Sequence, residues 1–243
     1  MKRFCLIIPV YNEMDSLPKN LPRAYKEVKK LRGEAIIAED GSTDGSKEFI
    51  KRFSLTHNIK YIMSEKRLGR GRALKNAMRF TDASIIGYMD ADLSVDIKYL
   101  KKAVKLVEEG NKIVIGSRYK NIKADRTVSR LIASKVYNIM LKLVFNSKIS
   151  DHQCGFKFFD SSLKNFCRSI ESDGWFFDSE LLIKAQKNGI PIYELPVKYH
   201  ESRITRVRPT NIFYFIRKIL DLRLKLGRLH KRKTKSLQNM LHT

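Results

Sequence analysis

The segment IIGYMDADLS, residues 85–94, is an apolar run that ends in two carboxylates, Asp90 and Asp92, separated by one residue. A short continuous apolar run followed by polar turn residues is typical of a strand buried on both faces of a parallel sheet. In open α/β folds the ligand binds at the carboxyl ends of such strands. The segment therefore predicts a buried strand with a binding site at its end.

Similar apolar runs alternate with helical patterns along the rest of the first half. Strands are predicted at 4–10, 35–38, 59–63, 85–89 and 113–115, and helices at 17–31, 46–54, 71–80 and 96–109. This order predicts an α/β fold with a doubly wound, mostly parallel sheet and helices on both faces. Further on we expect a helix at 128–146, a strand at 156–159, a helix at 178–188, a strand at 192–197 and a final helix.

The composition is that of a strongly basic globular protein. Of the 243 residues, 43% are hydrophobic, and 49 Lys and Arg against 25 Asp and Glu give a formal net charge of +24. Most of this excess lies in residues 117–243, so this half is expected to face an anionic partner. Three scattered cysteines match neither a disulfide framework nor a CxxC metal site, which favours a reducing compartment.

Four loops are expected to converge at the carboxyl edge of the sheet. They are PVYNE (9–13), EDGSTDG (39–45), the loop of Asp90 and Asp92, and GSRY (116–119). Two carboxylates one residue apart, completed by water and substrate phosphates, are suitable ligands for Mg²⁺ or Mn²⁺. Each motif alone is common turn chemistry. RLGRGRAL (67–74) only superficially matches a dinucleotide fingerprint, because Leu74 replaces the third glycine.

In this order and spacing, PVYNE, EDGSTDG and DADLS together resemble family 2 of the glycosyltransferases, which have the GT-A fold. The second half is similar to dolichyl-phosphate mannose synthases and dolichyl-phosphate β-glucosyltransferases through GSRY, RLIAS (130–134), SDHQCGFKFF (150–159), FFDSELL (176–182) and ELPVKY (194–199). The resemblance implies a metal-dependent enzyme that transfers a sugar, with inversion, from a GDP-mannose or UDP-glucose type of donor to a polyprenyl (dolichyl) phosphate.

The resemblance also implies roles for residues of the first half. Pro9, Tyr11 and Glu13 would line the nucleotide, and Asp40 would hydrogen-bond the base. Asp90 would contact the nucleotide-sugar and share the metal with Asp92, which would bind it on the diphosphate. Ser94 stands where many mannose synthases have Gln, so the third protein ligand of the metal stays open.

In the second half the resemblance points to basic residues. Arg118 and Arg130 match the phosphate-facing arginines of the family, and with Asp92 they are the expected catalytic residues. Arg203 and Arg206 stand where relatives carry a basic loop near the acceptor phosphate. A domain of residues 1–210 would hold the whole catalytic apparatus, followed by a basic amphipathic helix and tail at 211–243.

Two other functions stay open at this point. A soluble family 2 glycosyltransferase that acts on a glycan hydroxyl would need a carboxylate base, and Asp151 or Asp178 is available. A phosphate acceptor needs none, because its oxygen is already anionic near neutral pH. Nucleic-acid binding would explain the charge, but the acidic cluster would repel phosphate, and no RNP-like motif is present, so no nucleic-acid partner is expected.

Residues 212–229 form an amphipathic helical pattern with the charged side chains mostly opposite the apolar arc. The arc contains Ile212, Phe213, Phe215, Ile216, Ile219, Leu220, Leu222 and Leu226. Together with the apolar helix at 128–146 and the basic sequence HKRKTK (230–235), it predicts a cytoplasmic enzyme bound peripherally to an anionic membrane surface. No spanning helix is expected. The alternative is that the stripe docks on the sheet.

Overall fold

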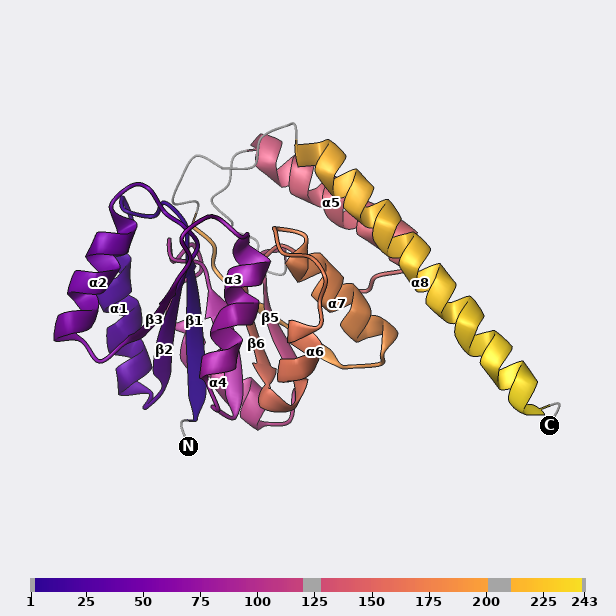
Figure 1. Cartoon of the computed structure of the whole chain (residues 1–243), viewed down its shortest axis with the longest axis horizontal. Coiled ribbons are helices and arrows are strands. Elements are labelled where there is room, and N and C mark those ends of the chain that lie inside the picture. The colour runs from indigo at the N-terminus through magenta and orange to yellow at the C-terminus, as the bar shows by residue number, and fades with distance from the viewer. Residues whose placement is uncertain (1–2, 120–127, 201–210, 242–243) are drawn as a thin grey trace.

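The computed structural model describes residues 3–119, 128–200 and 211–241 and, within these ranges, all side chains except those of 128–130, 211–212 and 229–241. Seven strands form one sheet in the order β3-β2-β1-β4-β6-β5-β7 (Figure 1). The strands are β1 (Phe4–Val10), β2 (Glu34–Glu39), β3 (Lys60–Met63), β4 (Ile85–Met89), β5 (Ile113–Ser117), β6 (Phe156–Asp160) and β7 (Ile192–Pro196). Only β6 runs antiparallel to its neighbours, β4 and β5.

Helices cover both faces of the sheet. They are α1 (Leu17–Lys30), α2 (Ser46–Thr56), α3 (Arg70–Ala77), α4 (Tyr99–Glu108), α5 (Val128–Phe145), α6 (Lys164–Arg168), α7 (Phe177–Lys187) and α8 (Asn211–Leu241). The core on one face includes side chains of α1, α2 and α4, and the core on the other includes side chains of α3, α6 and α7. Alternate side chains of β1 enter opposite cores: Leu6 and Ile8 the first, Cys5 and Ile7 the second.

The predicted architecture is confirmed. The predicted strands and helices are present, with ends that shift by up to three residues, and the sheet is mostly parallel. The predicted helix at 71–80 is α3 followed by a short 3-10 turn, Met78–Phe80. The sequence did not predict α6, the 3-10 turn Ser161–Leu163 or the antiparallel direction of β6. The predicted domain boundary at residue 210 lies outside the described residues and stays a prediction.

The helix pair α5 and α8, here called the helix layer, packs beside the sheet rather than on it (Figure 1). A third core joins α5 and α8 to α7 through Tyr137, Leu141, Phe145, Phe176, Ile183, Phe215, Ile219 and Leu222. Part of the predicted apolar arc of α8 is therefore buried within the protein. Phe213, Ile216, Leu220 and Leu224 of the same helix are exposed.

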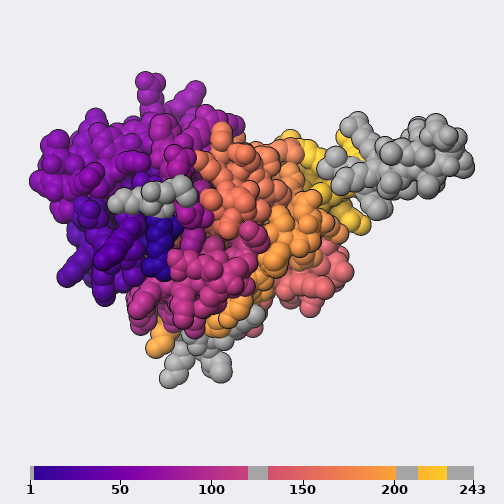
Figure 2. Space-filling view, turned by 90° about the horizontal axis from the view of Figure 1, so that it is seen from below, coloured from indigo at the N-terminus to yellow at the C-terminus, as the bar shows by residue number. Residues whose placement is uncertain are grey.

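The exposed row of α8 has a counterpart on α5. Ile132, Val136, Ile139 and Leu143 follow one another at intervals of three or four residues and are all exposed. The space-filling view shows α8 at one end of a continuous body (Figure 2). No helix in the described part of the chain is long and apolar enough to span a bilayer.

Candidate active site

Three of the four loops predicted to converge, those at the carboxyl ends of β1, β2 and β4, meet, and the segment 66–70 joins them. The fourth predicted loop, GSRY (116–119), ends β5 at the same edge of the sheet, with β6 between β5 and β4. The loops that meet, residues 9–13, 39–46, 66–70 and 90–94, are called the carboxylate edge. The first two are tied directly: the Asn12 backbone N–H donates to Ser42 Oγ (2.9 Å) and the Thr43 N–H donates to Asn12 Oδ1 (2.8 Å). Pro9, Tyr11 and Glu13 are partly buried in this arrangement.

The segment 66–70 contacts two residues that are predicted to bind the nucleotide, Asp40 and Tyr11. The carboxylate of Asp40 accepts backbone N–H donors from Leu68 (2.7 Å) and from Gly69 (3.0 Å). Burial raises the pKa of Asp40, although these donors counteract the rise. The Arg67 guanidinium lies 4.0 Å from the centre of the Tyr11 ring. Asp40 therefore orients the segment 66–70. A hydrogen bond from a nucleotide base to Asp40 would use carboxylate oxygens that already accept from Leu68 and Gly69.

Asp90 lies at the end of β4 against two residues that fix its carboxylate. Arg70 donates to Asp90 Oδ1 from Nη2 (2.8 Å) and from Nε (3.2 Å). A Cβ at position 155 would lie 1.7 Å from Asp90 Oδ2, so only glycine leaves room for this side chain. Burial raises the pKa of Asp90, and the neighbouring Asp92 adds to the rise against the effect of Arg70. Asp90 and Asp92 are thus close enough to repel each other, and a bound cation would relieve this repulsion.

Asp92 is oriented by Ser94. Asp92 Oδ1 accepts the Ser94 backbone N–H (2.9 Å), and Oδ2 accepts the Ser94 hydroxyl (2.6 Å). Among the described residues, no group of three or more Asp, Glu, His or Cys side chains is placed to hold a metal. The residues present fit a hard divalent cation only if a ligand such as a diphosphate supplies much of the coordination shell.

A chain of buried charges continues from Asp90 into the protein. Arg70 Nη1 donates to Asp178 Oδ2 (2.5 Å), and Asp178 Oδ1 accepts from Lys157 Nζ (2.8 Å) and from the Tyr88 hydroxyl (2.5 Å). Burial raises the pKa of Asp178, but Arg70 and Lys157 outweigh it, so the pKa lies below its usual range. Positive and negative groups alternate, which makes the network neutral and fixes Asp90 in place.

Arg118 forms a second buried ion pair, with Asp151. Its Nε and Nη2 each donate to one carboxylate oxygen over 2.7 Å, and its backbone N–H donates to Oδ2 (3.0 Å). The Asp151 side chain is fully buried, and only 7% of the Arg118 side chain is exposed. Arg130 lies in α5, but its side chain falls outside the described part of the chain, as do Arg203 and Arg206 entirely. The roles expected of these arginines stay predictions.

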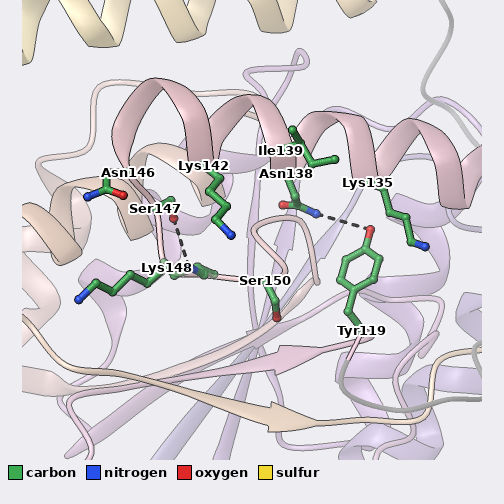
Figure 3. Close-up of a pocket in the computed structure, with 10 residues that line it drawn as sticks. Tyr119, Lys135, Asn138, Ile139, Lys142, Asn146, Ser147, Lys148 and Ser150 are labelled. Atoms are coloured by element: carbon green, nitrogen blue, oxygen red, sulfur yellow. Dashed lines mark hydrogen bonds between the residues drawn. The ribbon is translucent and has the colours of Figure 1, made fainter.

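A pocket of about 510 Å³ lies between α5 and the segment 146–150, beside Tyr119 (Figure 3). Its lining consists of Tyr119, Lys135, Asn138, Ile139, Lys142, Asn146, Ser147, Lys148, Ile149 and Ser150. Three lysines and no acidic residue line it, and Figure 3 shows Lys142 directed from α5 toward the segment below. The pocket is therefore electropositive.

Sequence reasoning missed Arg70 and Lys157, and it considered Asp178 only as a base for the hydroxyl-acceptor alternative. Arg70 lies in the segment that was compared with a dinucleotide fingerprint, and its charge between two glycines was the available signal. Glu180 accepts the backbone N–H groups of Glu171 (3.1 Å) and Ser172 (3.0 Å) and so anchors the segment before α7.

The fold and the carboxylate pair at the end of β4 define a protein of the GT-A glycosyltransferase class. A model of glycosyl transferase family 2 matches residues 5–165. Glycosyltransferase AglD from Haloferax volcanii is 32% identical over 210 residues, which cover 83% of this chain and 34% of that protein. A dolichyl-phosphate beta-glucosyltransferase from Trichomonas vaginalis is 32% identical over 210 residues, covering 81% of this chain and 65% of that protein. The chain belongs to glycosyl transferase family 2, as predicted.

The chain spans between a third and about two thirds of the length of these relatives. Solved structures share its fold. Glucosyl-3-phosphoglycerate synthase from Mycobacterium tuberculosis, in complex with Mn²⁺, UDP and glucosyl-3-phosphoglycerate, has a TM-score of 0.68 and 16% identity, covering 92% of this chain and 79% of that chain. A mannosyltransferase from Pyrobaculum calidifontis, in complex with GDP-Man and Mn²⁺, has a TM-score of 0.59 and 20% identity, covering 84% and 58%. The predicted GT-A fold is confirmed.

Proposed function

We propose that this protein transfers a sugar from a nucleotide-diphosphate sugar to a polyprenyl phosphate, with inversion at the anomeric carbon. The observation that carries this proposal is that neither Asp151 nor Asp178, the two candidates for the base that a hydroxyl acceptor would need, is free to accept a proton. Asp151 and Asp178 are both buried, and both are bonded to cations. Their lowered pKa values make each a weak proton acceptor. An acceptor that is already anionic requires no base.

The donor would bind at the carboxylate edge. Asp90 and Asp92 would hold a divalent cation on the diphosphate, which supplies charge stabilisation for the departing nucleoside diphosphate. Arg70 keeps the Asp90 carboxylate in one orientation, and Ser94 does the same for Asp92. Tyr11, Arg67 and Asp40 would receive the nucleotide. Mn²⁺ beside UDP or GDP-Man in the two structural neighbours supports this assignment.

The acceptor phosphate would approach from the side of Arg118 and α5. Three lysines without an acidic neighbour line the pocket that begins at Tyr119, the residue after Arg118. A phosphate is a suitable occupant, because lysine binds it as a point charge. Relatives named as dolichyl-phosphate beta-glucosyltransferases, from Trichomonas vaginalis and Dictyostelium discoideum, support a lipid phosphate. In this scheme Arg118 and Arg130 stabilise the acceptor, while Arg203 and Arg206 belong to its basic surroundings.

The helix layer would bring this site to a membrane surface. Helices α5 and α8 pack against each other, each carries an exposed apolar row, and Lys135 and Lys142 flank the row of α5. Apolar rows bordered by basic residues bind anionic interfaces by partial insertion together with charge attraction. We therefore propose peripheral binding through both helices, with residues 211–243 as one part of that surface.

The test incubates the protein with a panel of UDP- and GDP-sugars, Mg²⁺ or Mn²⁺, and either a short polyprenyl phosphate or an alkyl glycoside. Products are identified by mass. We expect a sugar phosphate lipid from one donor and no product from the glycoside. Transfer to the glycoside hydroxyl alone would contradict the proposal and would establish the hydroxyl-acceptor alternative. Salt-sensitive retention of RNA without any sugar transfer would favour the nucleic-acid alternative.

A further inference from the structure

Trp175 is the one tryptophan of the chain, and it lies beside the candidate active site without a role assigned above. Its side chain is 39% exposed, which is unusual for a large ring next to a buried charge network. The Arg70 guanidinium lies 5.7 Å from the centre of the Trp175 ring, and the same guanidinium is bonded to Asp90. Trp175 is therefore one side chain away from the carboxylate pair.

The backbone around Trp175 is anchored on two sides. The Arg72 N–H donates to the Asp173 carbonyl (3.0 Å), which ties the segment to α3. The Phe177 N–H donates to the Gly174 carbonyl (3.2 Å), which closes a turn at the start of α7. An indole on an anchored backbone presents a rigid apolar surface at little entropic cost.

The segment also touches the helix layer. A Cβ at Gly174 would lie 2.9 Å from the Tyr214 hydroxyl of α8, so backbone and helix approach closely at the residue before Trp175. Trp175 thus lies between the carboxylate edge and α8, which packs against α5 on the side proposed for the acceptor. The transferred sugar has to occupy this same interval, since it leaves one substrate for the other.

The contacts of residues 67–70 give the direction of the bound donor. Arg67 contacts Tyr11, then Leu68 and Gly69 contact Asp40, and then Arg70 contacts Asp90. If the nucleotide binds at the first contacts and the diphosphate at the last, the sugar lies beyond Asp90, where Trp175 follows. This step rests on the proposed function.

We infer that Trp175 forms the wall against which the transferred hexose packs, and that it selects for a donor that carries a sugar. Its ring would cover an apolar face of the pyranose, while Arg70, whose guanidinium lies over the indole, holds Asp90 nearby. An aromatic ring offers a sugar a flat apolar surface, and its electron-rich face attracts the polarised C–H groups. Trp175 makes no contribution to nucleotide binding in this arrangement.

The test uses the intrinsic fluorescence of Trp175, which reports on this position alone. With Mg²⁺ present, the emission is followed during titration with UDP, UDP-glucose, GDP and GDP-mannose, and affinities are measured in parallel by calorimetry. We expect the sugar nucleotide of the true donor to change the emission more than its nucleoside diphosphate does. Equal changes from the two would overturn the inference, whereas the proposed function would stand if transfer to the lipid phosphate occurs.

A series of variants distinguishes two roles of Trp175: packing against the transferred sugar, or only shielding Arg70 from solvent. Trp175→Ala should raise the KM of the donor about tenfold, equivalent to about 1.4 kcal/mol, and leave the affinity for the nucleoside diphosphate unchanged. Trp175→Phe should recover most of the loss. Phe80→Ala, which truncates another exposed aromatic residue, should have no effect. An equal loss of affinity for nucleotide and donor would overturn the inference; absence of any nucleotide binding by the wild-type protein would overturn the proposed function as well.

Discussion

The carboxylate edge and the helix layer differ in how far their side chains already have partners within the protein. From the carboxylate edge a chain of paired charges leads inward, from the partly exposed Asp90 through the buried Arg70 and Asp178 to Lys157. In the helix layer, large apolar side chains such as Phe213 and Leu143 are about 80% exposed. Apolar rows of this size on a monomer are typical of surfaces that bind something further.

The difference indicates which part is complete before any ligand arrives. A buried network of alternating charges holds one geometry, because each displaced group would leave its neighbour unpaired at a cost of several kcal/mol. The carboxylate edge is therefore preorganised for its ligand. In the helix layer, only the side chains that face the third core are buried. Burial of the exposed apolar rows against a further surface would stabilise this layer more.

Removal of the metal or of Asp92 should have the largest effect. Excess chelator should abolish transfer, and Asp92→Asn should lower kcat/KM by about a thousandfold, since about 4 kcal/mol of charge stabilisation would be lost. Far-UV circular dichroism should show an intact fold. Asp96→Asn removes a carboxylate four residues further on, and its activity should stay near that of the wild type. Full turnover in chelator would contradict the metal assignment.

Arg70→Gln should destabilise the protein by about 3 kcal/mol, because it leaves Asp90 and Asp178 without their shared cation. Arg70→Lys keeps the charge but loses the forked geometry, so it should lower kcat more than it lowers the free energy of unfolding. Urea denaturation and steady-state kinetics measure the two quantities. Arg3→Gln, which removes one partner of an exposed ion pair with Glu108, should cost less than about 1 kcal/mol. Equal losses of stability for the variants of Arg3 and Arg70 would show that the buried network holds its geometry no more firmly than an exposed ion pair does.

Two phenylalanines of α8 provide a matched pair within the helix layer. Phe215 is 8% exposed and Phe213 is 79% exposed. Phe215→Ala should lower the free energy of unfolding by about 3 kcal/mol, whereas Phe213→Ala should leave it within about 0.5 kcal/mol of the wild type. Cosedimentation with anionic liposomes at low salt should weaken for Phe213→Ala. Wild-type protein that stays in the supernatant would contradict the membrane proposal.

Lys142 should give the smallest effect. Because it is an exposed single charge in the electropositive pocket, Lys142→Gln should raise the KM of polyprenyl phosphate by about twofold to fivefold, equivalent to less than about 1 kcal/mol. The effect should diminish as salt is added. Lys26→Gln removes an exposed lysine from α1 and serves as the control. An identical change for both variants would show that only the total charge matters.

The strands and the carboxylate pair could be predicted because each depends on local pattern. The segment 85–94 contains both the apolar run of β4 and the two acids that follow it. Periodicity identifies a strand, and the end of a parallel strand identifies the edge of the sheet. β6 has the same kind of apolar pattern, but its direction depends on the path of the chain between residues 117 and 156, which no local pattern encodes.

The network around Asp90 could not be predicted for the same reason. Arg70 and Asp178 are 108 residues apart in sequence, and each lies at or next to the start of a helix where a charged residue is unremarkable. The fold brings them together. Arg118 was expected to face a phosphate, yet its buried pairing with Asp151 depends on a segment 33 residues away. Such partners become visible only in three dimensions.

The place of β6 in the sheet has a consequence for how the protein is made. β4 pairs with β1 on one side and with β6 on the other, and β6 is translated about 70 residues later. During synthesis the apolar edge of β4 therefore stays unpaired after the rest of the first half has formed, and Arg70 meets Asp90 before Asp178 exists. A nascent chain of which only the residues up to a point between 117 and 155 have left the ribosome would present an open strand edge, the kind of surface that recruits chaperones or other nascent chains.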